Sequence, residues 1–175
     1  PGSVSAQEAA AALGPAVPVR ALAEAVAAAD AVVLAVPGSA VDELLTGLGR
    51  ALDGKVVVDA TNNLAPAGAG GPLHDAELLA RTAPAAAYAR AFNTLGWENM
   101  AEPVIAGERA DLLWAGPDGA AGAVVEALVR ATGLRPVRIG GAEVAGLLDG
   151  MTRLWFQLAF KAGYGRRVAF RVLGA

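Results

Sequence analysis

The stretch AVVLAVPGS, residues 31–39, predicts a short strand that ends in a tight turn. Six apolar residues follow Asp30 and stop at Pro37-Gly38, a pattern typical of a strand buried on both faces. Ser39, with Asp42 three residues later, predicts the N-cap of a following helix. In an open α/β sheet such a strand–turn–helix corner is where ligands bind, beyond the carboxyl ends of the strands.

Composition limits the classes of function that the chain can have. A chain of 175 residues, 55% of them hydrophobic, is long enough for one domain with a sizeable core. The absence of cysteine excludes disulfides, thiolate nucleophiles and cysteine-based metal sites, and His74 is the only histidine, so we predict no metal site. A net charge of −3 argues against a general nucleic-acid partner. No apolar run approaches the roughly 18–20 residues that span a bilayer, which predicts a cytoplasmic protein without a membrane partner.

Strand-like and helix-like segments alternate along the chain. The expected strands are residues 31–36, 55–62, 86–92, 111–115 and 137–139, and helices are expected at 40–52, 75–82 and 120–132. From Ala142 onward the pattern is helical. This alternation predicts an α/β fold with a doubly wound parallel sheet and a C-terminal helical segment.

Polar residues follow the apolar runs of the second and third expected strands. These are Asp59, Thr61 and Asn62 after one strand, and Asn93 and Thr94 after the next. Parallel strands place their carboxyl ends at one edge of the sheet, so these residues are expected to line a crevice for a small molecule. The alternative interpretation is that they only form turns and caps.

The C-terminal segment is basic and largely apolar. Its cations are Arg153, Lys161, Arg166, Arg167 and Arg171, and no acidic residue follows Asp149. They either attract an anionic cofactor or only offset a helix dipole and face solvent. Apolar side chains nearly encircle the segment, which predicts burial against a partner subunit in a homodimer.

Several motifs in order resemble a known family. They are GKVVVDATN at 54–62, AFNTLG at 91–96, WAGPD at 114–118 and AGLLD at 145–149. With residues 31–37 they resemble the NADPH-dependent coenzyme F420 reductases, whose relatives include pyrroline-5-carboxylate reductase-like Rossmann domains. The resemblance implies a Rossmann-like fold, NADP and coenzyme F420 as cofactors, and hydride transfer between a nicotinamide and a deazaflavin. That reaction requires no catalytic side-chain nucleophile and no metal.

The chain also departs from this family pattern. Family members open with a strand, a glycine-rich turn, a helix and a strand that ends in a Ser/Thr-Arg pair, whereas Pro1 is expected to lie just past that point. No Gly-x-Gly-x-x-Gly follows a strand anywhere in the chain. We therefore expect residues 1–140 to form a partial dinucleotide-binding domain with exposed strand edges and weak affinity for a dinucleotide. Residues 141–175 are expected to contact the second cofactor or a dimer partner.

The resemblance also implies a set of cofactor contacts. The strand–turn–helix corner would pack near the nicotinamide, the end of the second strand would hold a ring amide or the substrate, and the end of the third would line a ring-stacking cleft. These residues are Val36, Pro37, Ser39, Asn62, Asn93 and Thr94. Each has a structural alternative as a core, capping or turn residue. Trp97 is expected to cover the pocket or to be packing only, and His74 to be a surface or capping residue rather than an acid or base.

Three hypotheses about function follow. The first is an NADP-linked oxidoreductase with a deazaflavin acceptor. The second keeps the nicotinamide cofactor and changes the acceptor to an imine, a flavin or a ferric chelate. The third is a truncated Rossmann module that binds a ligand without turnover. A short-chain dehydrogenase is disfavoured because the chain has no Tyr-x-x-x-Lys motif.

Overall fold

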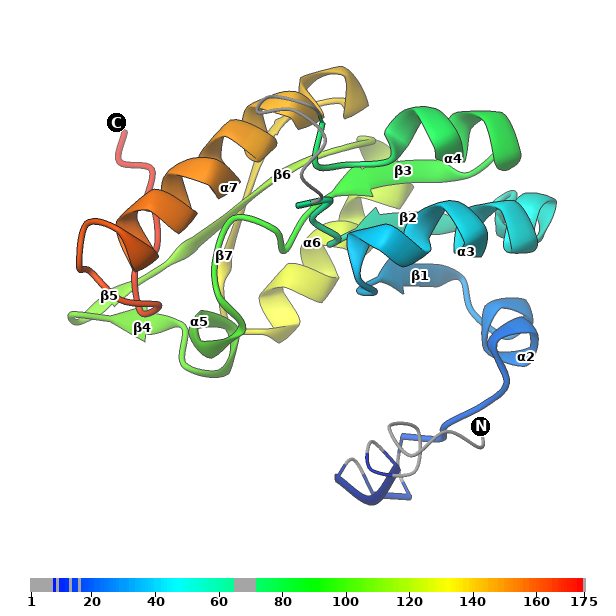
Figure 1. Cartoon of the computed structure of the whole chain (residues 1–175), viewed down its shortest axis with the longest axis horizontal. Coiled ribbons are helices and arrows are strands. Elements are labelled where there is room, and N and C mark those ends of the chain that lie inside the picture. The colour runs from blue at the N-terminus through cyan, green and yellow to red at the C-terminus, as the bar shows by residue number, and fades with distance from the viewer. Residues whose placement is uncertain (1–7, 9, 13, 16, 65–71, 175) are drawn as a thin grey trace.

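The computed structural model describes residues 8, 10–12, 14–15, 17–64 and 72–174. A five-stranded sheet with helices on both faces forms its centre (Figure 1). Its strands, in spatial order, are β1 (Ala31–Leu34), β2 (Val56–Asp59), β3 (Ala87–Arg90), β6 (Asp111–Ala115) and β7 (Arg135–Gly140). None of the helices in the described part of the chain has the length and apolar character needed to cross a bilayer. This architecture confirms the predicted Rossmann-like α/β fold class.

The first three strands are parallel, as predicted, and their carboxyl ends meet at one edge of the sheet. Val32 pairs with Val57 and Val57 with Tyr88 in this register. β2 lies between two neighbours and all four of its residues are buried, because its Val-Val-Val run has an apolar side chain for each face. The predicted central strand is therefore confirmed.

The fourth strand of the sheet runs against the third, so the prediction of a wholly parallel sheet is wrong here. β3 and β6 are antiparallel and pair only at Arg90 and Ala115, whereas β6 and β7 are parallel again. A parallel connection needs a crossover that carries the chain along the length of the sheet. Residues 91–110 form instead the short helix α5 (Trp97–Ala101) and the hairpin of β4 (Val104–Ile105) and β5 (Glu108–Arg109).

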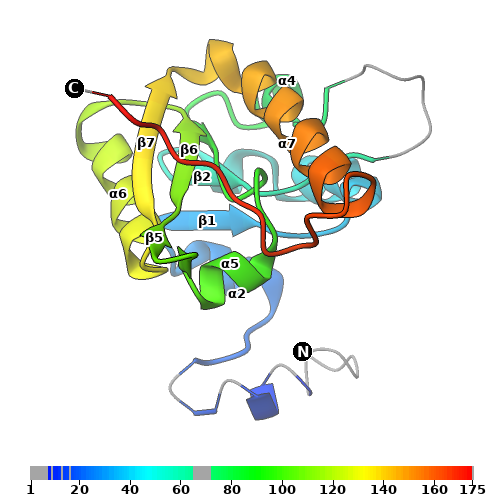
Figure 2. The same cartoon turned by 90° about the vertical axis from the view of Figure 1, so that its left-hand side faces the viewer.

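Helices cover both faces of the sheet. On one face, α3 (Val41–Leu48) and α4 (Ala76–Thr82) pack over Val57, and α7 (Ala145–Phe160) packs over Leu113. On the other face, α6 (Gly119–Ala131) packs over Val58 and the fully buried Trp114. Figure 2 shows α6 and α7 on opposite sides of β6 and β7. The apolar residues at helical spacing predicted within residues 40–52 lie on the side of α3 that faces the sheet.

The β1 edge of the sheet is open in the part of the chain that the structure describes. No described strand pairs with β1 on the side away from β2, and 45% of Val33 is exposed. The prediction that β1 is buried on both faces is therefore wrong, because the pattern of residues 31–36 is that of a central strand but its position is an edge. The short helix α2 (Leu22–Ala27) lies beside this edge (Figure 1).

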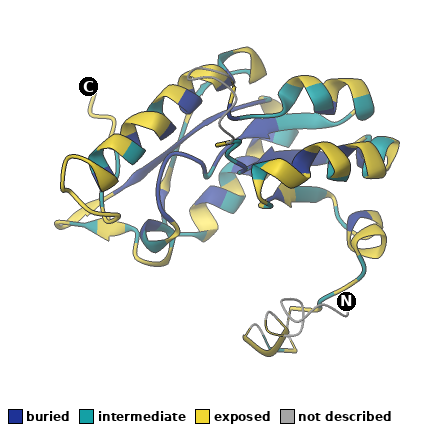
Figure 3. Ribbon diagram, in the orientation of Figure 1, coloured by how far each residue is buried: buried dark blue, intermediate teal, exposed yellow. Residues whose placement is uncertain are grey.

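The C-terminal residues are helical only in part. α7 ends at Phe160, and the chain then returns along the sheet, where Phe170 forms an isolated antiparallel bridge with Asp111. Irregular chain follows the helix, and Gly163 and Gly165 in it have positive φ values that favour glycine. The predicted helix beyond residue 160 is thus wrong. Figure 3 shows the outer side of α7 exposed and the sheet beneath it buried.

Candidate functional site

An apolar groove lies at the carboxyl ends of β1 and β2, on the face covered by α6. It has a volume of about 540 Å³ and contains two of the predicted cofactor contacts, Val36 and Asn62. Its other lining residues are Val33, Ala35, Ala60, Thr61, Phe92, Met100, Leu128 and Thr132. We call it the α6-side groove. A crevice is therefore present beyond the ends of β1 and β2, but the predicted residues Asn93 and Thr94 do not line it.

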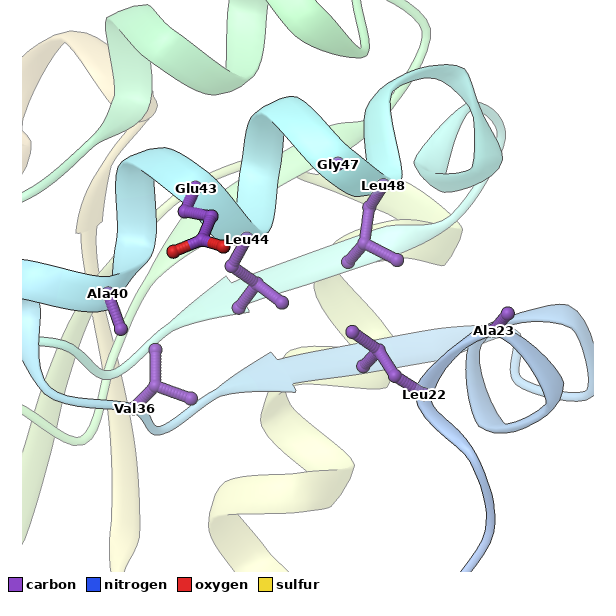
Figure 4. Close-up of a pocket in the computed structure, with 8 residues that line it drawn as sticks. All are labelled: Leu22, Ala23, Val36, Ala40, Glu43, Leu44, Gly47 and Leu48. Atoms are coloured by element: carbon purple, nitrogen blue, oxygen red, sulfur yellow. The ribbon is translucent and has the colours of Figure 1, made fainter. Parts of the chain in front are cut away.

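A second apolar groove lies on the opposite face of β1, between α2 and α3. Its volume is about 520 Å³, and Val36 is common to both grooves. Figure 4 shows Leu22 of α2 facing Leu44 and Leu48 of α3 across this α2–α3 groove, with the Glu43 carboxylate on α3 beside them. The sequence pattern did not predict it, because it is formed where α2 and α3 lie opposite each other and not by any motif.

The turn after β1 packs on the chain that follows β2. A Cβ placed on Gly38 would lie 2.6 Å from Cα of Asn63, so only glycine allows this approach. Pro37 and Ser39 are exposed on this turn, and Ser39 lies in a short 3₁₀ segment, Gly38–Ala40. The N-cap of α3 is Ala40 and no side chain caps it, so the predicted capping role of Ser39 is wrong. The chain reverses direction through 3₁₀ geometry instead.

Two further predicted contacts lie under α7. Asn93 and Thr94 are both buried, and Nδ2 of Asn93 donates to Oγ1 of Thr152 at 2.7 Å. Oγ1 of Thr152 in turn donates to the carbonyl oxygen of Asn93. Neither residue is part of the lining of the two apolar grooves. The preceding residue, Phe92, does line the α6-side groove, with a φ of 66° that few non-glycine residues adopt.

A buried charge cluster lies at the ends of β2 and β3, on the face of the sheet covered by α7, and contacts Asn62 of the α6-side groove. Arg90 is 0% exposed, donates from Nη1 to Oδ1 of Asp59 at 3.1 Å and from Nη2 to Oδ1 of Asp149 at 3.2 Å. The same guanidinium donates to the carbonyl oxygen of Thr61 and to Oδ1 of Asn62, the latter at 3.1 Å. Arg90 therefore joins the end of β2 and the helix α7 through one side chain.

The carboxylate of Asp59 is surrounded by donors. It accepts from the backbone and hydroxyl of Thr61 at 2.9 and 2.6 Å, and from the hydroxyl of Tyr88 at 2.9 Å. Burial, together with the charge of Asp59, raises the pKa of Tyr88, so that the phenol remains a donor. Burial also raises the pKa of Asp75, and the Asp59 carboxylate raises it further.

Asp149 anchors α7 to the loop before α4. Its Oδ2 accepts from the backbone of Leu73 and contacts Nδ1 of His74, both at 2.7 Å. Burial alone would raise the pKa of Asp149, but the hydrogen bonds from His74 and Leu73 and the charge of Arg90 outweigh it and lower that pKa. His74 is accordingly a packing partner of Asp149, not the surface or capping residue that we predicted.

Sequence reasoning missed Arg90 and Asp149. One signal was present: Arg90 interrupts an otherwise apolar strand, and the parallel register places it opposite Asp59. A cationic side chain in a buried strand requires a partner of opposite charge, and Asp59 lies at the paired position. The partner on α7 carries no comparable signal, because Asp149 follows Arg90 by 59 residues.

Three of the basic C-terminal residues form ion pairs within the chain. Arg166 binds Glu98, Arg167 binds Glu102 and Arg171 binds Glu108. These pairs account for three of the cations that were candidates for attracting an anionic cofactor, and they favour the structural interpretation. Trp97 is 67% exposed and lines neither apolar groove. Among the described residues, no group of three or more histidines and carboxylates is arranged to hold a metal ion.

Comparisons with known proteins place this geometry in a family context. Residues 1–63, which include β1, β2 and Asn62, match the family model described as NADP oxidoreductase, coenzyme F420-dependent. A search of curated protein sequences found no match.

Two solved structures are similar to this chain over most of its length. A candidate F420-dependent NADP reductase from Arthrobacter sp. FB24 is 26% identical with a TM-score of 0.76, and the match covers 89% of this chain and 74% of that one. A hypothetical protein from Sinorhizobium meliloti is 25% identical with a TM-score of 0.58, with 87% and 71% covered. These matches confirm the resemblance predicted from the sequence: residues 1–63 match the model of the coenzyme F420-dependent NADP oxidoreductases, and most of the chain is similar in structure to a candidate F420-dependent NADP reductase.

Proposed function

We propose that this NADP-dependent oxidoreductase transfers a hydride between NADPH and a deazaflavin acceptor of the coenzyme F420 type, with the nicotinamide in the α6-side groove. The observation that supports this most is the position of the groove. It lies at the carboxyl ends of the parallel strands β1 and β2, and the lining residues from those strand ends belong to the segment that matches the family model. This edge is where open α/β sheets bind nucleotides.

The chemistry of the α6-side groove suits a flat ring with one polar substituent. A volume of about 540 Å³ lies within the usual range of small-molecule sites. Apolar side chains such as Val36, Phe92 and Leu128 form its walls, whereas Asn62 offers a side-chain amide at one end. We infer that the ring packs against the apolar walls and that its carboxamide meets Asn62.

The chain itself would bind and orient rather than react. When bound, the nicotinamide supplies the hydride, and no side-chain nucleophile or metal is required. The groove walls exclude water from one ring face, and the second ring would stack on the other face at van der Waals distance. The remaining predicted contacts, Pro37, Ser39, Asn93 and Thr94, are not part of the groove lining and remain predictions.

The C-terminal segment completes the proposal. Leu147 and Leu154 leave an apolar outer side of α7 exposed, which supports the homodimer predicted from the sequence. We propose that residues 141–175 contribute to this contact. The division into residues 1–140 and 141–175, and a role of the latter in binding the second cofactor, remain predictions.

The test is the oxidation of NADPH by the purified protein, followed by absorbance, with a deazaflavin as acceptor. Parallel reactions contain a flavin, a cyclic imine or a ferric chelate. We expect turnover with the deazaflavin at least tenfold faster than with the other acceptors. Faster turnover with one of those acceptors would replace the deazaflavin in the proposal, and NADPH binding without any turnover would favour a non-catalytic binding module.

A further inference from the structure

Asn62 lines the α6-side groove, and a hydrogen bond fixes the orientation of its side-chain amide. Its Oδ1 accepts from Nη2 of Arg90 at 3.1 Å. Because a guanidinium has only donors, the oxygen of the amide and not its nitrogen must face Arg90. The Nδ2 hydrogens are therefore the end of the Asn62 amide that is turned away from the guanidinium.

Arg90 is itself held in place. It has no exposed surface, and the carboxylates of Asp59 and Asp149 bind it from two different elements, β2 and α7. Its Nη1 also donates to the backbone carbonyl of Thr61, the residue before Asn62. A side chain with fixed partners on both sides keeps one rotamer, so the orientation of the Asn62 amide is set before any ligand arrives.

We propose that Arg90 is a positioning residue: by binding Oδ1 of Asn62 beside the α6-side groove, it presents the Nδ2 hydrogens to the ligand, so that the site selects a ring with a carbonyl acceptor. This inference rests on the proposed function, since it concerns the same groove. The carboxamide oxygen of a nicotinamide has the required chemistry. A ring with only a donor at this position would meet a second donor and lose affinity.

The test compares NADP with two analogues by titration calorimetry. The 3-acetylpyridine analogue keeps a carbonyl oxygen, whereas the thionicotinamide analogue replaces it with sulfur, a weaker acceptor. For the unaltered protein we expect the two oxygen ligands to bind within about threefold of each other and the sulfur ligand about tenfold more weakly, the effect of one hydrogen bond. Equal binding of the sulfur and oxygen ligands would overturn the inference.

Asn62→Asp reverses the hydrogen-bonding character of the side chain and keeps its size and its contact with Arg90. We expect NADP to bind at least about tenfold more weakly and the preference for oxygen over sulfur to disappear. Asn63→Asp is the matched control, because it adds the same charge one residue later; it should retain the oxygen preference. An Asn62→Asp variant that keeps the preference would contradict the role of the amide.

The role of Arg90 has a separate test. Arg90→Lys keeps the buried positive charge but loses the second arm of the guanidinium, so the oxygen preference should fall with Asn62 unaltered. A measurement on the unaltered protein covers the case in which this variant does not fold: the Nδ2 order parameter of Asn62 from ¹⁵N relaxation. A value near about 0.85 is expected for a fixed amide, and a value below about 0.6 would refute fixed orientation.

The outcomes separate the two proposals. If the unaltered protein does not bind NADP, the proposed function fails and this inference with it. If the protein binds NADP but shows no preference for oxygen over sulfur, only the positioning role is refuted.

Discussion

Two sets of ion pairs join the C-terminal part of the chain to the rest, and they differ in environment. Arg90, Asp59 and Asp149 form the buried charge cluster at the strand ends, where the arginine has no exposed surface. The pairs of the C-terminal residues, such as Arg166 with Glu98, lie at the surface, with 42% of the Arg166 side chain exposed. Water screens the second set but not the first. We therefore expect the buried ion pairs of Arg90 to matter much more for stability and function than the exposed pair of Arg166 and Glu98.

The largest effect is expected from removing the cation of the buried charge cluster. Arg90→Met leaves the carboxylates of Asp59 and Asp149 buried without their partner, which should lower the free energy of unfolding by about 3–5 kcal/mol. Arg166→Met is the matched control, because the released Glu98 can be solvated, and it should change stability little. Chemical denaturation of both variants measures the difference. Similar losses in the two variants would refute the distinction between the clusters.

A smaller effect is expected from Asp149. Because its pKa is lowered in the fold, its contribution to stability is present above the unfolded value of about 3.9 and is lost as the pH falls through the folded value. Asp149→Asn should therefore cost about 2 kcal/mol at neutral pH, the effect of losing charged hydrogen bonds, and progressively less below about pH 4. Thermal unfolding at several pH values tests this. A pH-independent cost would contradict the assignment.

The pKa of Asp75 is shifted in the opposite direction to that of Asp149, so the expected effect of its substitution on stability is also opposite. Burial and the charge of Asp59 raise its pKa, so its ionisation at neutral pH opposes folding, and Oδ2 has no hydrogen-bond partner. Asp75→Asn should increase stability at neutral pH by roughly 1 kcal/mol or less, with no gain below about pH 4. Glu77→Gln, on the exposed side of the same helix, is the control for a general loss of negative charge. A loss of stability in Asp75→Asn at neutral pH would be inconsistent with this account.

The sequence predicted the parts of the fold that depend on local pattern. The apolar runs at residues 31–36 and 55–62 are parallel neighbours, and the spacing in α3 identifies the side that faces the sheet. It did not predict that β6 runs antiparallel, because strand direction depends on how residues 91–110 fold and not on the pattern of β6 itself.

The candidate site could be predicted in its location but not in its chemistry. Residues that follow strands, such as Val36 and Asn62, were identified because parallel strands end at one edge. Arg90 and Asp149 were not, since their role depends on a contact between residues far apart in the sequence. Asn93 also follows a strand, but its side chain bonds Thr152 of α7, so its contact with a cofactor remains a prediction.

The central claim is that the α6-side groove, and not the α2–α3 groove on the other face of β1, holds the nicotinamide. Ala35 lines only the first groove and Ala23 only the second. The decisive measurement is the NADPH dissociation constant of Ala35→Trp beside that of Ala23→Trp, because each indole fills one groove. We predict that Ala35→Trp weakens binding at least about tenfold and that Ala23→Trp leaves it within about threefold of the unaltered protein. The reverse order would contradict the account.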